Sequence, residues 1–272
     1  MNKQNRVAII GGGNIGLAIA RGLSKSKKYF PGDIFITRRN TDPISDYKNK
    51  GFNVTKNNPE AVRNSDVIII AVQPQQLNDL LHEISKELKP SKHILISVVS
   101  GAGINAIKKQ VGKEIRVVRA MPNTAIAIQE SMTCLASSSK NDSSLETAKN
   151  IFDSLGKTLV IEEELMIPAT ALCACGIAFF LRAVRAASQG GIEIGFHSEE
   201  ALLMAAQTAK GAASLLLSME NHPEHEVDKV TTPRGCTISG LNQMEHSGFS
   251  SAMIRGIVTS ADKAASLYKV NN

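Results

Sequence analysis

The chain has 272 residues, a formal net charge of +6 at pH 7 and a hydrophobic content of 43%. These values are typical of a globular protein with one large or two modest domains. Its lysines and arginines are scattered, without a long basic arm or interleaved aromatic residues, so a nucleic-acid partner is not expected. The mild basic excess favours a small anionic ligand instead.

Signals for targeting and for disulfide bonding are sparse. The sequence contains no signal-peptide pattern and no unbroken run of about eighteen apolar residues, the length that a membrane-spanning helix needs. Its four cysteines do not make a disulfide framework in a chain of this size. We therefore expect no membrane span and a cytoplasmic location.

Short apolar runs alternate with helical patterns up to residue 161. Continuous apolar runs bounded by polar residues are what parallel strands require when helices cover both faces of their sheet. The pattern predicts an α/β fold of the Rossmann type, with a doubly wound, mostly parallel sheet. Predicted strands cover residues 7–10, 33–37, 66–72, 93–99, 115–119, 132–136 and 158–161, and a predicted helix covers residues 14–26.

A Gly-x-Gly-x-x-Gly pattern follows the first predicted strand and opens the first predicted helix. Such glycines allow a tight turn, close approach of a pyrophosphate and close packing of helix on strand, while the helix N-terminus offers unpaired N–H groups. The alternative is a turn with a structural role only. The residues expected to bind a dinucleotide here are Gly11, Gly13, Asn14, Ile15 and Gly16.

The end of the second predicted strand indicates which dinucleotide is bound. Sites for NAD usually place an acidic residue there to bind the ribose hydroxyls. This chain has Thr37, Arg38 and Arg39 instead, and two guanidinium groups can pair with a 2′-phosphate. We expect NADP(H) as the cofactor, with NAD(H) as the alternative; a solvated basic loop would explain the same residues without a ligand.

Other predicted strand ends should line the same cleft, because ligands bind beyond the carboxyl ends of strands in open α/β sheets. Asn58 is a candidate contact for the ribose, although an Asn before Pro59 is equally typical of a helix N-cap. The remaining cofactor candidates are Ala71, Val72, Gln73, Pro74, Ser100 and Asn123.

The composition changes from about residue 163, where alanine becomes frequent and no convincing strand follows. We expect a Rossmann domain at 1–162 and an all-helical domain at 163–272. Glycine- and proline-containing clusters separate the helical patterns. The predicted helices lie near 163–188, 198–220, 238–246 and 250–268.

Four segments of the sequence carry a family resemblance: "RAMPNT", "TALCACGIAFF", "ENHP" and "TPRGCTISGLNQMEHSGFSSAMIRGI". In this order, after an N-terminal Rossmann turn, they resemble pyrroline-5-carboxylate reductase over nearly the whole chain. The segment 233–241 is the most telling, since it is similar to the family's P-G-G-T-T-x-A-G-L pattern. The resemblance implies NADPH-dependent hydride transfer to the imine carbon of 1-pyrroline-5-carboxylate, which gives L-proline in the last step of proline biosynthesis.

The resemblance also implies where the substrate binds. It assigns the hydroxyl of Thr237 to the imine nitrogen and places Glu220 near the same pocket, as the two catalytic candidates. From the residues alone, Thr237 could be a helix N-cap and Glu220 a solvated acid at a helix end. N–H groups at the start of a helix would hold the substrate carboxylate. The substrate-binding candidates are Met121, Val230, Pro233, Gly235, Cys236 and Thr237.

The chain departs from the family pattern at a few positions. Cys173-Ala174-Cys175-Gly176-Ile177 stands where S-G-S-G-P is usual, and the loss of the proline should let the helix continue without a kink. Because residues two apart on a helix face different ways, these cysteines suit a tight helix crossing better than a metal site, and no metal is expected. Gln73 replaces a frequent lysine. Arg234 replaces a glycine, and it either opposes a positive φ or adds a cation near the substrate.

Cys236 departs from the family pattern too, because it stands where a threonine or alanine is usual. A thiol at a helix N-terminus is a candidate for oxidation.

Two rival functions remain open from the sequence. One is a related reductase, of another cyclic imine or of the β-hydroxyacid dehydrogenase type; the latter needs a catalytic lysine, which 163–188 lacks. The other is an NADP(H)-binding protein without catalysis. The helical half is short and alanine-rich, so we expect it to pack against a second copy in a homodimer or larger assembly.

Overall fold

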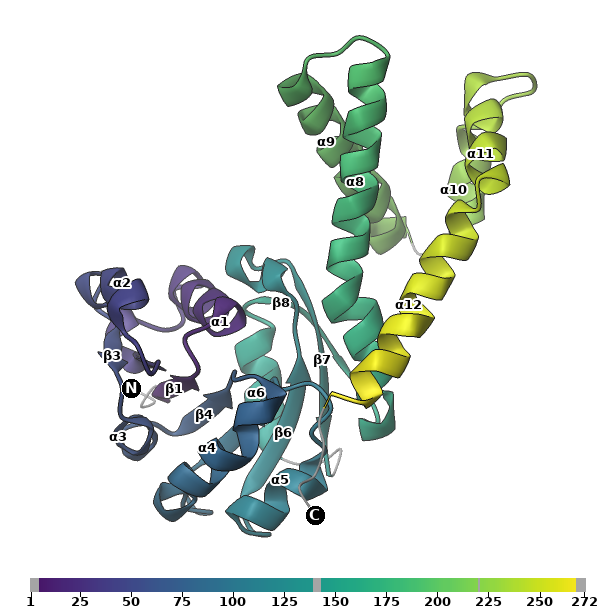
Figure 1. The fold of residues 1–272 in the computed structure, drawn as a ribbon. Helices are drawn as coiled ribbons and strands as arrows, with labels where there is room; N and C mark the ends of the chain where they lie inside the picture. The colour runs from purple at the N-terminus through teal and green to yellow at the C-terminus, as the bar shows by residue number, and fades with distance from the viewer. Residues whose placement is uncertain (1–4, 139–142, 220, 268–272) are drawn as a thin grey trace. The chain divides into compact units, whose positions relative to one another are not determined.

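The computed structural model describes residues 5–138, 143–219 and 221–267 (Figure 1). Packing divides the chain into two units, one of residues 1–175 and 260–272 and the other of residues 176–259. The first unit contains every described strand, and the second is helical. This arrangement confirms the expected fold class.

The first unit is built on an eight-stranded sheet with the order β3-β2-β1-β4-β5-β6-β7-β8. Strands β1 to β6 are parallel, β7 runs antiparallel to β6, and β8 runs parallel to β7. The strands are β1 (Val7–Ile10), β2 (Ile34–Thr37), β3 (Asn53–Thr55), β4 (Val67–Ile70), β5 (Ile94–Ser97), β6 (Arg116–Met121), β7 (Ser131–Ser137) and β8 (Gly156–Val160).

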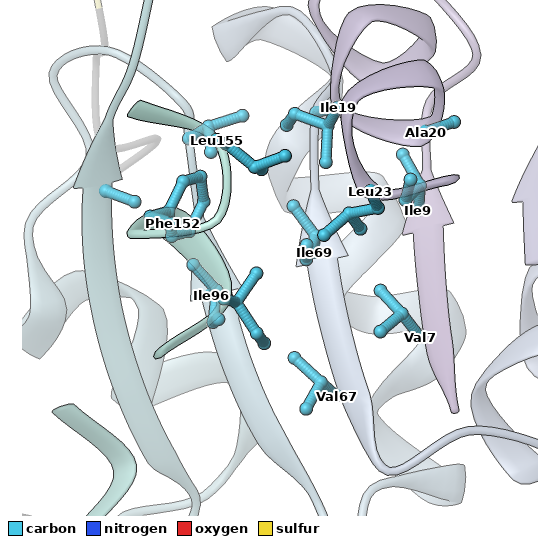
Figure 2. Close-up of a cluster of buried hydrophobic side chains, with 14 of the residues drawn as sticks. Val7, Ile9, Ile19, Ala20, Leu23, Val67, Ile69, Ile96, Phe152 and Leu155 are labelled. Carbon is cyan, nitrogen blue, oxygen red and sulfur yellow. The ribbon is translucent and has the colours of Figure 1, made fainter. Parts of the chain in front are cut away.

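Helices cover both faces of this sheet, which explains why the strands are apolar without alternation. Successive residues of a strand point to opposite faces, so Val7 and Ile9 enter one core while Ala8 and Ile10 enter the other. Figure 2 shows the first of these cores, where Leu23 and Phe152 meet the strand residues. It is closed by α1 (Asn14–Lys25) and α6 (Ser143–Phe152), and the opposite core by α3 (Asn58–Arg63), α4 (Leu77–Ile84) and α5 (Ile104–Val111).

The sequence pattern missed a short strand, β3, at the edge of the sheet. Its three residues, Asn53–Thr55, are only partly buried and include two polar side chains. A run this short and this polar lacks the apolar signal that marked the other strands. The sequence pattern also missed the five-residue helix α2 (Ser45–Asn49) that precedes this strand.

The second half consists of helices joined by turns and loops, with no strand among its described residues, as expected. Its helices are α7 (Met166–Ala169), α8 (Gly176–Glu193), α9 (Ser198–Met219), α10 (Pro223–Lys229), α11 (Cys236–His246) and α12 (Phe249–Ala265). Between α7 and α8 the segment Thr170–Cys175 forms a π-helical turn. The helix therefore continues past Cys173–Ile177 as expected, but with an expanded turn.

Two helical stretches, Glu163–Glu193 and Ser198–Ser218, are long and apolar enough to cross a membrane. Isolated polar residues such as Arg182 interrupt these stretches, so no unbroken apolar run occurs although the mean hydropathy is high. The expectation of no membrane span stays a prediction. A helix covered by another subunit has the same length and composition. Only 28% of the first window and 6% of the second are buried within the chain.

Gly22 gives a test of how tightly α1 packs on the sheet unit. A Cβ at this position would lie 2.5 Å from the carbonyl oxygen of Ile126 and 2.8 Å from Leu155 Cδ2. We expect Gly22→Ala to lower the free energy of unfolding by about 1–3 kcal/mol, because overpacking outweighs the better helix propensity of alanine. The urea midpoint at unchanged m-value measures this loss.

Gly32→Ala is the matched control, since a Cβ there meets nothing within 4 Å. We expect its free energy of unfolding to change by less than about 1 kcal/mol. Equal midpoints for the two variants would contradict the packing argument.

Candidate functional site

The glycine turn lies between β1 and α1 and is held by backbone contacts. Gly11 and Gly12 both donate their N–H groups to the Thr37 carbonyl, at 3.2 Å and 2.7 Å. Gly11 has φ +115°, and a Cβ on it would collide with the carbonyl of Ala71. A Cβ on Gly16 would in turn collide with the carbonyl of Gly11. The turn therefore has no room for side chains where it faces the sheet.

Gly13 differs from the other glycines of the turn. A Cβ there would meet nothing within 4 Å, so its outer side is open. It is the N-cap residue of α1 and, within the described chain, the helix start has neither a side-chain cap nor an acidic residue in its first turn. Free N–H groups beside open space are what a pyrophosphate requires, so these residues fit a dinucleotide.

A cavity of about 610 Å³ opens at this turn, beyond the carboxyl ends of β1, β2 and β4. Most of the expected cofactor residues line it: Gly11, Gly13, Thr37, Arg38, Arg39, Asn58, Ala71, Val72 and Gln73. The other expected cofactor residues, Asn14, Ile15, Gly16, Pro74, Ser100 and Asn123, are not part of its wall. The cavity is the clearest candidate cofactor site in the described part of the chain.

One end of this cavity is basic. Arg38 and Arg39 line it, and so does Lys56, which the sequence reasoning missed because it follows the unpredicted strand β3. Arg38 has a structural bond as well, since its Nη1 donates to the Gly12 carbonyl at 2.8 Å. Its guanidinium therefore braces the glycine turn, which leaves Arg39 and Lys56 as the exposed cations.

The opposite wall carries polar side chains from α3 and α4. Asn58 lines the cavity and donates from Nδ2 to Glu83 Oε2 at 2.9 Å. The N-cap of α3 is Asn57, whose Oδ1 accepts from the Glu60 N–H at 2.9 Å. The alternative reading of Asn58 as the helix cap is thus wrong by one residue, and its amide remains at the cavity wall.

The carboxyl ends of β5 and β6 are tied to the start of the helical half. The Glu163 carboxylate accepts from the Ile104 N–H at 2.6 Å and lies 3.5 Å from Arg119 Nη1. Burial lowers the pKa of Arg119, and the negative charge of Glu163 opposes that shift. This network holds the loop after β5, which contains Ser100, against the end of the neighbouring strand.

Met121 and Asn123, at the end of β6, are already engaged within the chain. Met121 is buried in a cluster with Cys134, Ala136, Met166 and Ala169. Asn123 accepts the Ala125 N–H on Oδ1 at 3.0 Å and donates from Nδ2 to the Cys173 carbonyl at 3.2 Å. A ligand role for either residue stays a prediction.

The substrate candidates of the second unit gather at the start of α11. Gly235 is its N-cap residue, without a side-chain cap among the described residues, and Cys236 and Thr237 are its first two residues. Thr237 is therefore not the N-cap, which removes its alternative role. Pro233 and Val230 lie just before this helix and are exposed, whereas Glu220 lies outside the described residues. The helix start presents N–H groups of the kind that bind a carboxylate.

Arg234 has φ +59°, in the left-handed region that favours glycine. Arg234 therefore adopts a backbone conformation that glycine would accept without strain. The arginine does not prevent the positive φ, and the strain typical of such a residue is about 1 kcal/mol. Its exposed side chain lies next to the start of α11.

Comparisons with known proteins match two parts of the chain to two family models. The family model for pyrroline-5-carboxylate reductase dimerisation matches residues 163–267, and the model for NADP oxidoreductase, coenzyme F420-dependent, matches residues 6–101. Pyrroline-5-carboxylate reductase 2 of Dictyostelium discoideum is 46% identical, over 100% of this chain and 97% of the relative. Pyrroline-5-carboxylate reductase 1 of the same organism is 56% identical over 97% of this chain, which spans only 50% of that relative's length.

Solved structures show the same similarity in three dimensions. Plasmodium falciparum pyrroline carboxylate reductase, solved with NADP bound, has a TM-score of 0.89 at 25% identity and covers 97% of this chain and 98% of its own. The Coxiella burnetii pyrroline-5-carboxylate reductase has a TM-score of 0.86 at 28% identity, covering 98% of this chain and 100% of its own. On these relatives, this chain belongs to the pyrroline-5-carboxylate reductase family.

Proposed function

We propose that the chain is an NADPH-dependent pyrroline-5-carboxylate reductase that forms L-proline in the last step of proline biosynthesis. The observation that carries this proposal is the similarity to reductases of this name over almost the whole chain, combined with a cavity that fits a dinucleotide. NADPH, when bound, supplies the hydride that the imine carbon accepts. The residues of the chain bind NADPH and the substrate, orient them for hydride transfer and polarise the imine.

The cofactor half of the site acts mainly by electrostatics. The N–H groups at the start of α1, next to Gly13, hold the pyrophosphate. Arg39 and Lys56, at the basic end of the cavity, pair with the 2′-phosphate, while Arg38 keeps the glycine turn in place.

The substrate half of the site requires a clamp for the carboxylate and a proton source for the imine. We assign the clamp to the N–H groups at Gly235, Cys236 and Thr237, at the start of α11. The Thr237 hydroxyl donates a hydrogen bond to the imine nitrogen, which makes the adjacent carbon a better hydride acceptor. Glu220 stays a prediction for the same pocket.

We assign the two halves of the chain to two roles, dinucleotide binding for 1–162 and dimerisation with substrate binding for 163–272. Many large apolar side chains of the helical half are exposed, including Phe180, Leu203 and Leu217 at 62%, 70% and 80%. A homodimer or larger homo-oligomer would cover them, which accounts for the apolar helices without a membrane. We place the enzyme in the cytoplasm, with a small-molecule substrate and no nucleic-acid partner.

The direct test gives purified protein NADPH and pyrroline-5-carboxylate and follows the absorbance of the reduced nicotinamide. We expect turnover, with proline as the product. Intact NADPH binding without turnover would refute the assignment in favour of a binding protein. Turnover with another cyclic imine alone would identify a related reductase.

The basic end of the cavity predicts cofactor selectivity. We expect Arg39→Ala to weaken NADPH binding by about 10- to 100-fold, because a charge-assisted bond to phosphate contributes roughly 1.5–3 kcal/mol. NADH affinity should hardly change, since NADH lacks the 2′-phosphate. Calorimetric titration of both dinucleotides measures the ratio.

Arg38→Ala serves as the contrast to that variant. Because Arg38 Nη1 binds the Gly12 carbonyl, its loss should weaken NADPH and NADH together. If Arg39→Ala reduced the affinities of the two cofactors equally, the assignment of Arg39 to the 2′-phosphate would be wrong.

The start of α11 predicts a separate effect on catalysis. We expect Thr237→Ala to lower kcat by about 10- to 100-fold with unchanged NADPH affinity, because the imine nitrogen loses its hydrogen-bond donor. Thr237→Ser should retain most of the rate. Ser239→Ala is the control, since the Ser239 side chain is exposed and its hydroxyl donates a hydrogen bond to the Gly235 carbonyl of the same helix start. Equal rates for the wild type and Thr237→Ala would remove the assignment.

A further inference from the structure

Two cysteines that lie 39 residues apart in the sequence face each other in the first unit. Cys134 is on β7, and Cys173 is in the π-helical turn Thr170–Cys175. Their sulfur atoms are 3.9 Å apart, within hydrogen-bond distance. Cys175 lies only two residues from Cys173, yet it has no thiol partner among the described residues.

The local structure explains which cysteine turns toward the sheet. Residues two apart on a helix point in different directions, so Cys173 and Cys175 cannot both face β7. Cys173 packs against the buried cluster that contains Met121 and Cys134, and its carbonyl accepts from Asn123 Nδ2. The pair is thus formed by packing between a strand and a helical turn, and not by the Cys-x-Cys pattern of the sequence.

The two thiols are chemically unequal. The hydrogen bond from Cys134 lowers the pKa of Cys173 to about 7, against the opposing effect of burial. The same interaction, together with burial, raises the pKa of Cys134. Cys173 is also the more accessible of the two, since Cys134 is only 4% exposed. A partly accessible thiolate next to a buried thiol is the arrangement of a redox-active pair.

We propose that Cys134 and Cys173 form a covalent modification site, a reversible thiol–disulfide pair oxidised by peroxides. The Cys173 thiolate attacks a peroxide oxygen, the O–O bond breaks, and hydroxide leaves as the sulfur becomes a sulfenic acid. The Cys134 sulfur then attacks the Cys173 sulfur, the S–O bond breaks, and the thiol proton leaves with the hydroxide as water. In sum, two thiols and one hydrogen peroxide give one disulfide and two water molecules, and a dithiol reductant reverses the oxidation.

The disulfide would act on the end of β6. An S–S bond is about 2.05 Å long, so the two sulfur atoms must approach each other by roughly 1.9 Å. Cys173 holds Asn123 through its carbonyl, and Met121 packs in the same cluster, so this movement reaches two residues assigned to the ligand sites. Resting on the proposed function, we expect the oxidised enzyme to turn over more slowly by about 10- to 100-fold, as displacements of this size can cause.

The chemical test uses the full-length protein treated with hydrogen peroxide, blocked with an alkylating reagent and digested without reductant. Mass spectrometry should find a peptide pair joined through Cys134 and Cys173, which dithiothreitol separates. The same pair should form in Cys175→Ser and be absent in Cys134→Ser, where Cys173 should carry a higher oxidation state instead. The proposal would be overturned if Cys134 and Cys173 were both still alkylated at a peroxide dose that had oxidised the exposed Cys236. A disulfide between Cys173 and Cys175 would overturn it too.

The kinetic test separates this proposal from the proposed function. All kinetic variants carry Cys236→Ala, so that oxidation of this exposed thiol at the start of α11 does not contribute. In this background, peroxide should lower the turnover with and without Cys175→Ser, and dithiothreitol should restore it, while Cys134→Ser should not show this reversible loss. A disulfide without any change in turnover would overturn the coupling through Asn123. Absence of turnover in the untreated, reduced enzyme would refute the reductase assignment, and the peptide mapping would still decide whether the thiol pair exists.

Discussion

The contact between the glycine turn and the neighbouring strand ends is the constraint on which the rest of the first unit depends. Gly11 lies against the carbonyl of Ala71, Gly16 lies against the carbonyl of Gly11, and the Thr37 carbonyl accepts two N–H groups from the turn. Any side chain on the inner face would push α1 away from the sheet. Because α1 covers one core of the sheet, the glycine turn beside the cavity also determines how closely α1 packs on that core.

Arg38 shows why a charged residue beside a ligand cavity need not have one role. Its guanidinium donates to the Gly12 carbonyl, so part of its hydrogen-bonding capacity stabilises the turn before any ligand binds. Among the described residues, Arg39 and Lys56 make no such bond to the turn, and they are exposed at the same end of the cavity. Under the proposed function, binding strength and cofactor selectivity are divided between neighbouring cations, and a double substitution would mix the two effects.

The sequence predicted those features that repeat locally or follow a short motif. Strands buried on both faces give continuous apolar runs, so every strand except β3 was visible, and the glycine motif located the cavity. Lys56 was missed because it depends on β3, which is too short and too polar to recognise. The pairing of Cys134 with Cys173 was equally hidden, because it depends on how β7 aligns with β6 and on one π-helical turn. Such features arise from tertiary packing, which no single segment encodes.

The same electrostatic device occurs at two helix starts in this chain. Both α1 and α11 begin after a glycine N-cap, so no N-cap side chain is available to accept a hydrogen bond from their first N–H groups. A Ser or Asp cap would typically stabilise each helix by only a few tenths of a kcal/mol relative to glycine, and it would occupy N–H groups that an anion could use. Under the proposed function, the pyrophosphate and the substrate carboxylate supply the missing partners, so ligand binding offsets the lost cap. Glycine at these two positions therefore favours ligand binding over the stability of the free protein.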